Sequence, residues 1–346
     1  MRFLYRIQLV FALLFVMSLP SFAQEDVDKF LEESVDDARK LVGAYVSPVM
    51  KSVSLGLNQG WYNTAKAHKI AGVDLTITVN AMTIPNSDLF YNVSSLNLQK
   101  VELDPSSPDY STGRAPTIIG PERAPVFRVK DASSTNFGQT FVGPGGLDLK
   151  NSIKTNKLPV PMAHLGFGLP KGTDIKFRFI PTVNFADDSE LKLFGIGVMH
   201  DIKQWIPGIK LMPFDLSAFF GYTKFKLESK FDVDPQGAPQ TGVFEMNATT
   251  VQVLISKKFS VITFYGGVGY NIAKSNLAMR GWYDIDNDGV KEPNNFEVNP
   301  LNLDFAASGP RLTVGTRLKL AVFTFHADYT VQKYQSLSVG FGIAVR

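Results

Sequence analysis

Residues 323–345 read FTFHADYTVQKYQSLSVGFGIAV, and this stretch alternates apolar and polar side chains twice over. Apolar residues occupy the odd positions from 323 to 331, while threonine, histidine and aspartate occupy the even ones. The same period of two returns from 337 to 345 after a short polar break. A period of two is typical of a β-strand with one apolar and one polar face. The stretch therefore predicts two neighbouring strands.

Segments elsewhere alternate in the same way, at residues 73–81, 214–223, 262–272 and 311–320. Each runs for about 9–12 residues, which exceeds the ~5–6 residues of most soluble strands and matches a tilted strand that crosses a bilayer. An open sheet in lipid would leave unpaired N–H and C=O groups, so the sheet must close. The predicted fold is all-β, a transmembrane antiparallel β-barrel of about 12–14 strands with an N-terminal amphipathic helix. A soluble secreted β protein also alternates and is the alternative.

The composition of the chain excludes several further classes of protein. The chain has 346 residues, of which 45% are hydrophobic, with no cysteine and a formal net charge of +3. The lack of cysteine excludes disulfide scaffolds, cysteine-ligated metal centres and a lipid-anchored lipoprotein. The near-neutral charge gives no indication of a nucleic-acid partner.

The first 23 residues have the layout of an export signal. Arg2 and Arg6 flank the apolar stretch 7–17, and Ser21 and Ala23 place small side chains before a cleavage site. We therefore expect residues 1–23 to be removed after Ala23 and the mature chain to reach the bacterial outer membrane. Its expected partners are outer-membrane lipid and the barrel-assembly machinery that inserts such proteins.

Residues 24–48 have a different period. Apolar side chains recur at spacings of three and four, which predicts an amphipathic helix that stops before Pro48. Acidic residues crowd its start, whereas Arg39 and Lys40 lie in its expected last turns, as the helix dipole favours. Two interpretations stay open: a solvated periplasmic helix that caps the barrel, or a plug that docks in a basic lumen.

The barrel is expected to occupy residues 49–346. Within it, residues 104–156 are dense in Pro, Gly, Ser and Asn, which predicts a long loop that folds over the mouth or into the lumen, or stays flexible at the surface. Residues 126–129 are a candidate for one short strand inside this loop.

Charged side chains lie in mid-strand on the polar faces, which a barrel turns toward its lumen. The lumen and transport candidates are Asp74, Lys176, Arg178, Arg311, Arg317, Lys319 and Asp328. Their basic majority would favour anions in a wet lumen. Glycines on the same faces would leave room for a plug or a passage; they are Gly267, Gly269, Gly340 and Gly342.

Amphipathic aromatic residues near the ends of strands suit the headgroup zone of a membrane. The expected interfacial anchors are Trp61, Tyr62, Trp205, Trp282 and Tyr283. For the first two, a platform that stacks on a ligand is the alternative.

Residues 284–289, DIDNDG, reproduce the first half of a calcium loop, with Asp284, Asp286 and Asp288 at alternate positions. Asn295 stands where the loop needs a bidentate glutamate, so a solvated acidic turn is the alternative. We expect no cofactor apart from this candidate calcium ion.

The sequences YVSP at 45–48, LNQGWYNTAK at 57–66 and GVDL at 72–75 lie close together. This region resembles the N-terminal signature of a domain-of-unknown-function family of outer-membrane barrels from Bacteroidota. A helix before a barrel is also distantly similar to the long-chain fatty-acid transporter type, whose N-terminal segment forms a hatch. The Asn-Pro-Ala start of that type is absent here, so the second resemblance is one of layout alone.

These observations predict a passive channel or transporter for small or hydrophobic solutes. The alternative is a non-conducting structural or adhesive barrel that its own helix and loop plug. The sequence has no nucleophile elbow, no phosphate-cradling loop and no histidine pair at metal-binding spacing. We therefore expect no enzymatic activity, and the residues do not identify a solute.

Overall fold

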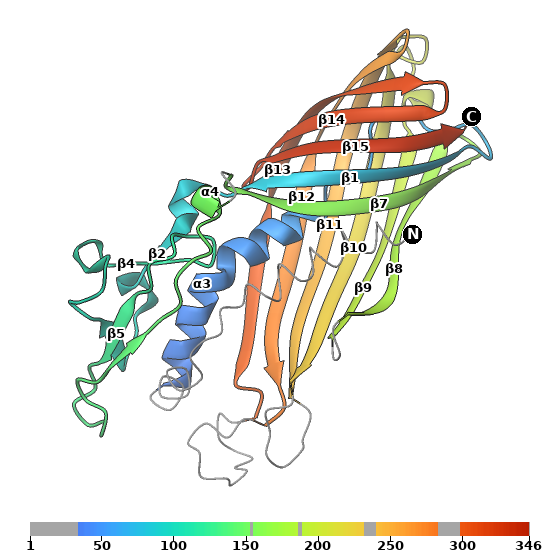
Figure 1. The fold of residues 1–346 in the computed structure, drawn as a ribbon. Helices are drawn as coiled ribbons and strands as arrows, with labels where there is room; N and C mark the ends of the chain where they lie inside the picture. Colours follow the sequence, from blue (N-terminus) through green and yellow to red (C-terminus); the bar gives the residue numbers. More distant parts are fainter. Residues whose placement is uncertain (1–33, 153–154, 186–188, 232–239, 283–297, 346) are drawn as a thin grey trace.

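The computed structural model describes residues 34–152, 155–185, 189–231, 240–282 and 298–345. In these residues, antiparallel strands close into a barrel in the order β1-β15-β14-β13-β12-β11-β10-β9-β8-β7 (Figure 1). The strands are β1 (Val73–Thr83), β7 (Lys157–Leu169), β8 (Thr173–Phe185), β9 (Ser189–Asp201), β10 (Asp215–Phe231), β11 (Gln240–Phe259), β12 (Ile262–Arg280), β13 (Leu301–Leu320), β14 (Phe323–Val331) and β15 (Ser336–Val345). The barrel closes where β1 pairs with β15.

The described residues contain a ten-stranded barrel, so the expected number of 12–14 strands is too high. The difference arises in β10–β13, which are 17 to 20 residues long. A strand needs only about 9–11 residues to cross the apolar layer of a bilayer, so each of these strands continues beyond it. Along β11, the outward residues are largely apolar from Val251 to Phe259 and polar at Asn247 and Glu245. One long strand therefore contains both a membrane crossing and an extension beyond it, with the same alternation in both parts.

The predicted alternation of the strands is confirmed. On β1, Leu75 and Val79 point outward and are 49% and 45% exposed, while the neighbouring Asp74 and Thr78 are buried inside. A soluble sandwich would bury the apolar face and expose the polar one, whereas a membrane barrel does the reverse. Among the described residues, no helix combines the length and apolar composition that a membrane crossing requires.

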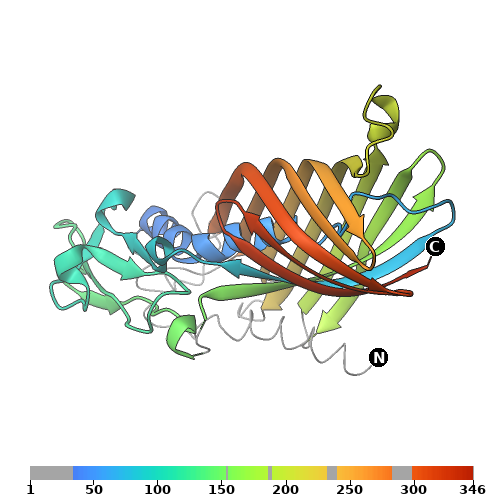
Figure 2. The ribbon, with the colours of Figure 1, turned by 90° about the horizontal axis from the view of Figure 1, so that it is seen from above.

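In the described residues, helix α3 (Val35–Gly56) precedes the barrel, and the side chain of Ser34 caps its start. The prediction that the helix stops before Pro48 is wrong, because Pro48 lies inside α3. Pro48 removes one bond of the helical ladder, but Met50 and Leu55 beyond it are buried among apolar residues of β11–β13. This burial favours continuing the helix to the barrel interior (Figures 1 and 2). Residues 24–33 of the expected helix lie outside the described residues.

The region between β1 and β7 is folded into strands and short helices. The prediction of a long loop at 104–156 is therefore wrong. We call its described residues, within 84–156, the cap. One small sheet pairs β2 (Phe90–Asn92) with β4 (Arg114–Pro116), and another joins β3 (Val101–Leu103), β5 (Val126–Val129) and β6 (Thr140–Val142). Short helices complete it: η1 (Asn86–Leu89), η2 (Ser94–Leu96), η3 (Tyr110–Thr112) and α4 (Leu149–Ser152). The short strand expected at 126–129 is confirmed as β5.

The glycines that predicted a loop instead allow the cap to pack closely. A Cβ added at Gly145 would lie 2.2 Å from the carbonyl oxygen of Glu122, and one at Gly146 would lie 2.1 Å from that of Gly120. Only glycine fits such close approaches of two chain segments. Composition alone does not separate this role from a flexible loop.

Candidate functional site: the occupied lumen

The chain crosses the inside of the barrel on its way from α3 to β1. We call residues 57–68 the lumen segment. Asn58 Nδ2 donates to the carbonyl oxygen of Thr249 on β11 at 3.1 Å, and Ser217 Oγ of β10 donates to that of Ala65 at 2.6 Å. The segment therefore spans the lumen and bonds to the wall along its length.

Two of the predicted lumen residues, Arg178 on β8 and Arg311 on β13, meet the end of α3. Arg178 Nη1 and Nη2 donate to the carbonyl oxygens of Leu57 and Gln59, at 2.7 and 2.5 Å. Arg311 Nη1 donates to the carbonyl oxygen of Asn58 at 3.0 Å, and its Nη2 donates to Gln59 Oε1 at 2.8 Å. Both side chains are buried. The two guanidinium groups thus hold the first three residues of the lumen segment.

This contact has an electrostatic cause. The last carbonyl groups of a helix lack donors within the helix and carry partial negative charge, so cations stabilise them. We expected Arg39 and Lys40 to supply these cations from the last turns, but the last turn of α3 contains no basic residue. Because α3 begins at residue 35 and ends at 56, both side chains lie near its start. The barrel wall supplies the cations instead, and of the carbonyl oxygens that they bond, that of the C-cap residue Leu57 belongs to the helix end.

The prediction that Trp61 is an interfacial anchor is wrong, because the side chain is 1% exposed and lies inside the barrel. Its ring centroid is 3.6 Å from Cζ of Arg178, a cation–π contact. Gly197 on β9 and Gly221 on β10 pair in register beside it, and a Cβ at either would lie 2.9 Å from the indole. The wall therefore has a recess that fits this side chain.

Tyr62 is also buried, so its expected role as an anchor is wrong too. Its hydroxyl group donates to Gln252 Oε1 at 2.6 Å, and its ring packs against Phe219 and Tyr265. A Cβ at Gly267 would lie 2.8 Å from the hydroxyl oxygen. The expectation that inner-wall glycines leave room for a plug is confirmed at this position.

At its far end, the lumen segment meets a group of charged and imidazole side chains. His68 Nδ1 is 2.8 Å from Asp174 Oδ2, and His68 Nε2 is 3.7 Å from Asp74 Oδ1. Asp74 also pairs with Lys176 at 3.5 Å and with His164 at 3.2 Å. The predicted lumen residues Asp74 and Lys176 are therefore brought together.

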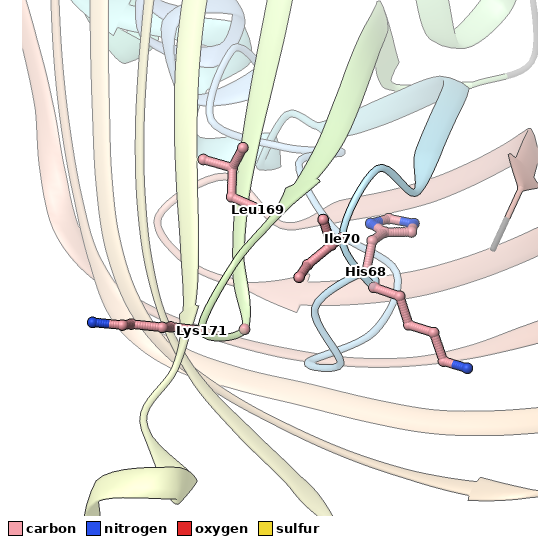
Figure 3. A pocket seen from close by; sticks show the side chains of 6 residues that line it. His68, Ile70, Leu169 and Lys171 are labelled. Atoms are coloured by element: carbon pink, nitrogen blue, oxygen red, sulfur yellow. The ribbon is translucent and has the colours of Figure 1, made fainter.

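An open pocket of about 630 Å³ lies beyond this group, at the mouth of the barrel. Its lining residues are His68, Lys69, Ile70, Leu169, Lys171 and Gly172 (Figure 3). They come from the chain that leads into β1 and from the turn between β7 and β8. The pocket therefore belongs to the mouth opposite α3.

The three remaining lumen candidates also lie on the inner face. Asp328 is buried and accepts a hydrogen bond from Tyr265 at 2.9 Å, and Arg317 is buried on β13. Lys319 is half-buried and donates to the carbonyl oxygen of Ala344 at 3.2 Å. A part for any of the seven candidates in solute passage stays a prediction.

The other predicted residues have separate outcomes. Trp282 is 3% exposed, so its expected role as an anchor is wrong; its backbone pairs with Val298, and its carbonyl oxygen accepts a bond from Gln240 Nε2 at 2.7 Å. Trp205 is 63% exposed on the loop after β9, and its anchor role stays a prediction. Tyr283 and the calcium candidates at 284–288 lie outside the described residues. Within the residues that are described, no group of three His, Asp or Glu side chains could hold a metal ion.

A buried carboxylate that the sequence analysis missed joins α3 to the cap. Asp37 is fully buried and accepts bonds from the backbone N–H groups of Gln99, Lys100 and Val101, the shortest being 2.7 Å. Successive N–H groups of this kind form an anion-binding concavity. Nothing in the sequence around residue 99 indicates such a concavity.

A second contact supports the same junction. The hydroxyl group of Tyr45 donates to the carbonyl oxygen of Gly145 at 2.9 Å. Burial raises the pKa of Tyr45 well above its usual value, so the hydroxyl group stays a donor. The cap, α3 and the lumen segment are therefore linked in one continuous structure.

A family model matches residues 1–345, and its description is a family of unknown function, DUF6588. The chain belongs to this family. The predicted resemblance to an uncharacterised family is thus confirmed, while its assignment to Bacteroidota stays a prediction. No curated protein matches the chain.

Several solved structures share the barrel fold. The chain is similar to Ail, the attachment invasion locus protein of Yersinia pestis, with 9% identity, a TM-score of 0.26, and coverage of 80% of this chain and 99% of that one. It is similar to the translocator domain of autotransporter NalP from Neisseria meningitidis, with 12% identity, a TM-score of 0.27, and coverage of 86% and 93%. The toluene transporter TbuX of Ralstonia pickettii has 6% identity and a TM-score of 0.21, with coverage of 80% and 90%. Likeness this distant carries no argument about this chain, and the closed barrel rests on its own strand order.

Proposed function

We propose that this protein is an outer-membrane barrel whose axis is closed by its own chain, and that it presents the cap at one mouth without conducting ions. The observation that carries the proposal is the pair of buried arginines, Arg178 and Arg311, that hold the start of the lumen segment. The recess at Gly197 and Gly221 that fits Trp61 supports it independently. Of the two expected functions, the geometry favours the plugged barrel.

The strength of the closure supports this choice. The two arginines donate four hydrogen bonds to the lumen segment, and hydrogen bonds to charged groups contribute about 1.5–3 kcal/mol each. Such contacts oppose displacement of the segment from the lumen. Passage of a solute along the axis, as a transporter would allow, therefore requires the lumen segment to leave first.

Conductance in planar lipid bilayers tests the proposal. We expect the wild-type protein to show no stable conductance steps, and a variant that lacks residues 24–65 to show them. Heat-dependent mobility on a denaturing gel reports whether each variant forms a barrel. Stable open steps from the wild-type protein would overturn the proposal.

We further propose that the cap faces the outside of the cell, rather than the periplasm. Turns at 170–172, 260–261 and 321–322 join strands at the end away from the cap, which also carries the longer connection 202–214. The end with the cap also carries the extensions of β10–β13. Bacterial barrels have short periplasmic turns and longer extracellular loops, which supports this orientation.

Labelling of single cysteines tests the orientation, because the chain has no native cysteine. Phe137 in the cap is 59% exposed, and we expect the F137C variant to react with a membrane-impermeant maleimide on intact cells. The control variant A321C, in a tight turn at the other end, should react only after lysis. The reverse pattern would show that the cap is periplasmic.

A further inference from the structure

The barrel wall is incompletely paired between β7 and β8. These strands pair only from Leu165 with Phe177 to Leu169 with Thr173, next to their turn. Beyond this point, residues 157–164 stay paired with β1, and β8 stays paired with β9. In the described chain, no ladder pair joins these two outer stretches. Figure 1 shows β7 and β8 diverging from their turn, and we call this divergence the seam.

The sequence of β7 prevents the seam from closing. Backbone groups of Asn156 and Gly168 bond toward the β1 side. Alternate residues of a strand direct their N–H and C=O groups to opposite neighbours, so the odd-numbered residues of β7 face β8. Pro159 and Pro161 occupy two of these odd positions, and proline has no N–H to donate. Both prolines therefore leave the β1 ladder intact and interrupt only a ladder with β8.

The strand across the seam, β8, is irregular as well, in its ladder with β9. The register of β8 against β9 shifts between Ile180 and Val183, and Pro181 lies in this bulge. Prolines and bulges on a strand edge also block pairing with a strand from another protein. The seam is therefore a poor site for strand addition.

The seam begins at the depth of the outward apolar belt. Pro161 pairs with Val79, which is 45% exposed on the outer face of β1. Phe179, on the outer face of β8, is 70% exposed. The medium in front of this part of the seam is therefore the acyl region of the membrane, provided that the barrel is inserted as its apolar belt indicates.

The residues behind the seam are apolar and form one cluster with α3. Its members near the seam are Leu158, Val160, Met162, Ile180, Leu191, Leu193 and Val53. Gly56 at the end of α3 touches β7 closely, because a Cβ there would lie 2.7 Å from Val160 Cγ2. Leu158 and Ile180 at the two edges of the seam are half-buried, and the buried Val160, Met162 and Leu193 continue the apolar cluster from these edges to the helix inside.

We propose that the seam binds an acyl chain of a lipid from the surrounding leaflet, which lies between the edges of β7 and β8. An acyl chain matches the medium in front of the seam and the side chains behind it. Each proline removes one backbone donor that lipid could not satisfy, while the next pair beyond the ladder, Ala163 and Phe179, is not joined across the seam. The proposal rests on strand register and not on closure of the lumen, so either can fail without the other.

Fluorescence quenching by lipids with brominated acyl chains tests the proposal. Single cysteines labelled with bimane would be placed at Ile180, beside the seam, and at Phe225, where β9 and β11 pair fully on both sides. The two positions are matched, because both are half-buried and belong to the same inner cluster. Both also pair with Leu193 on β9, so they lie at the same depth in the barrel wall. The lipid-facing Val253 is the positive control.

We expect quenching in the I180C variant to approach that of V253C, and quenching in the F225C variant to be clearly weaker. If I180C does not form a barrel by heat-dependent mobility, L158C on the opposite edge of the seam replaces it with the same expectation. Equal, weak quenching at the seam position and at Phe225 would overturn the proposal. That result would mean that protein, rather than lipid, covers the seam.

Discussion

The Arg178→Met substitution should loosen the lumen segment without changing the barrel wall. Methionine is unbranched and apolar, so it occupies the site but cannot donate to the carbonyl oxygens of Leu57 and Gln59. Two hydrogen bonds from a charged donor, at about 1.5–3 kcal/mol each, and a cation–π contact with Trp61 would be lost. A loss of about 4 kcal/mol corresponds to roughly a thousandfold rise in the population with a displaced lumen segment.

Single-channel recording measures this population as the fraction of time in a conducting state. The control is Lys319→Met, which removes a cation from the same inner face but donates to β15 and not to the lumen segment. We expect frequent conductance steps from the R178M variant. The K319M variant, like the wild-type protein, should show no stable conductance steps. If R178M is folded and as silent as K319M, the arginine does not hold the lumen closed.

Two further substitutions test the packing around the lumen segment. Gly197→Ala places a Cβ 2.9 Å from the Trp61 ring and should lower the free energy of unfolding by about 1–3 kcal/mol, as seen in urea titrations of the folded barrel, whereas Gly309→Ala, with no atom within 4 Å, should not. A stable G197A variant would contradict the proposed recess. Asp37→Asn should weaken the bonds to the N–H groups of residues 99–101 and make the cap more sensitive to protease, whereas the exposed Asp36→Asn should not. Equal sensitivity of the two variants would mean that Asp37 does not hold the cap.

The strand pattern was predictable because the two faces of a barrel wall meet different solvents. The apolar Leu75 and Val79 face outward while the polar Asp74 and Thr78 face the lumen, so the amino-acid sequence itself shows the period of two. The number of strands was not predictable, because β10–β13 continue their alternation outside the apolar belt. The period does not change where a strand leaves the membrane.

The contents of the lumen were less visible in the sequence. Trp61 and Tyr62 have the chemistry of headgroup anchors, and an amphipathic lumen accepts the same chemistry. The residues that indicate where Trp61 lies are two glycines of the barrel wall. Gly197 and Gly221 face inward on neighbouring strands. Two such glycines in register leave a space that a large side chain must fill, but their register becomes known only with the fold.

The sequence indicates the seam more clearly than it indicates the contents of the lumen. Pro159 and Pro161 alternate within a segment that otherwise has the pattern of a strand, and proline is tolerated only at strand edges or bulges. Two prolines spaced by two residues therefore indicate one unpaired edge, even before the neighbouring strand is known. The sequence does not indicate which strand lies across that edge.

A disulfide between the lumen segment and the wall tests the central claim most directly. Thr64 Oγ1 and Ser256 Oγ lie 3.2 Å apart, and the chain has no other cysteine to compete with a T64C/S256C pair. We predict that mass spectrometry of the mildly oxidised protein in membranes finds residues 64 and 256 joined in one cross-linked peptide. Two free thiols in a correctly folded barrel would contradict the account, because they would place the lumen segment away from the wall of β11.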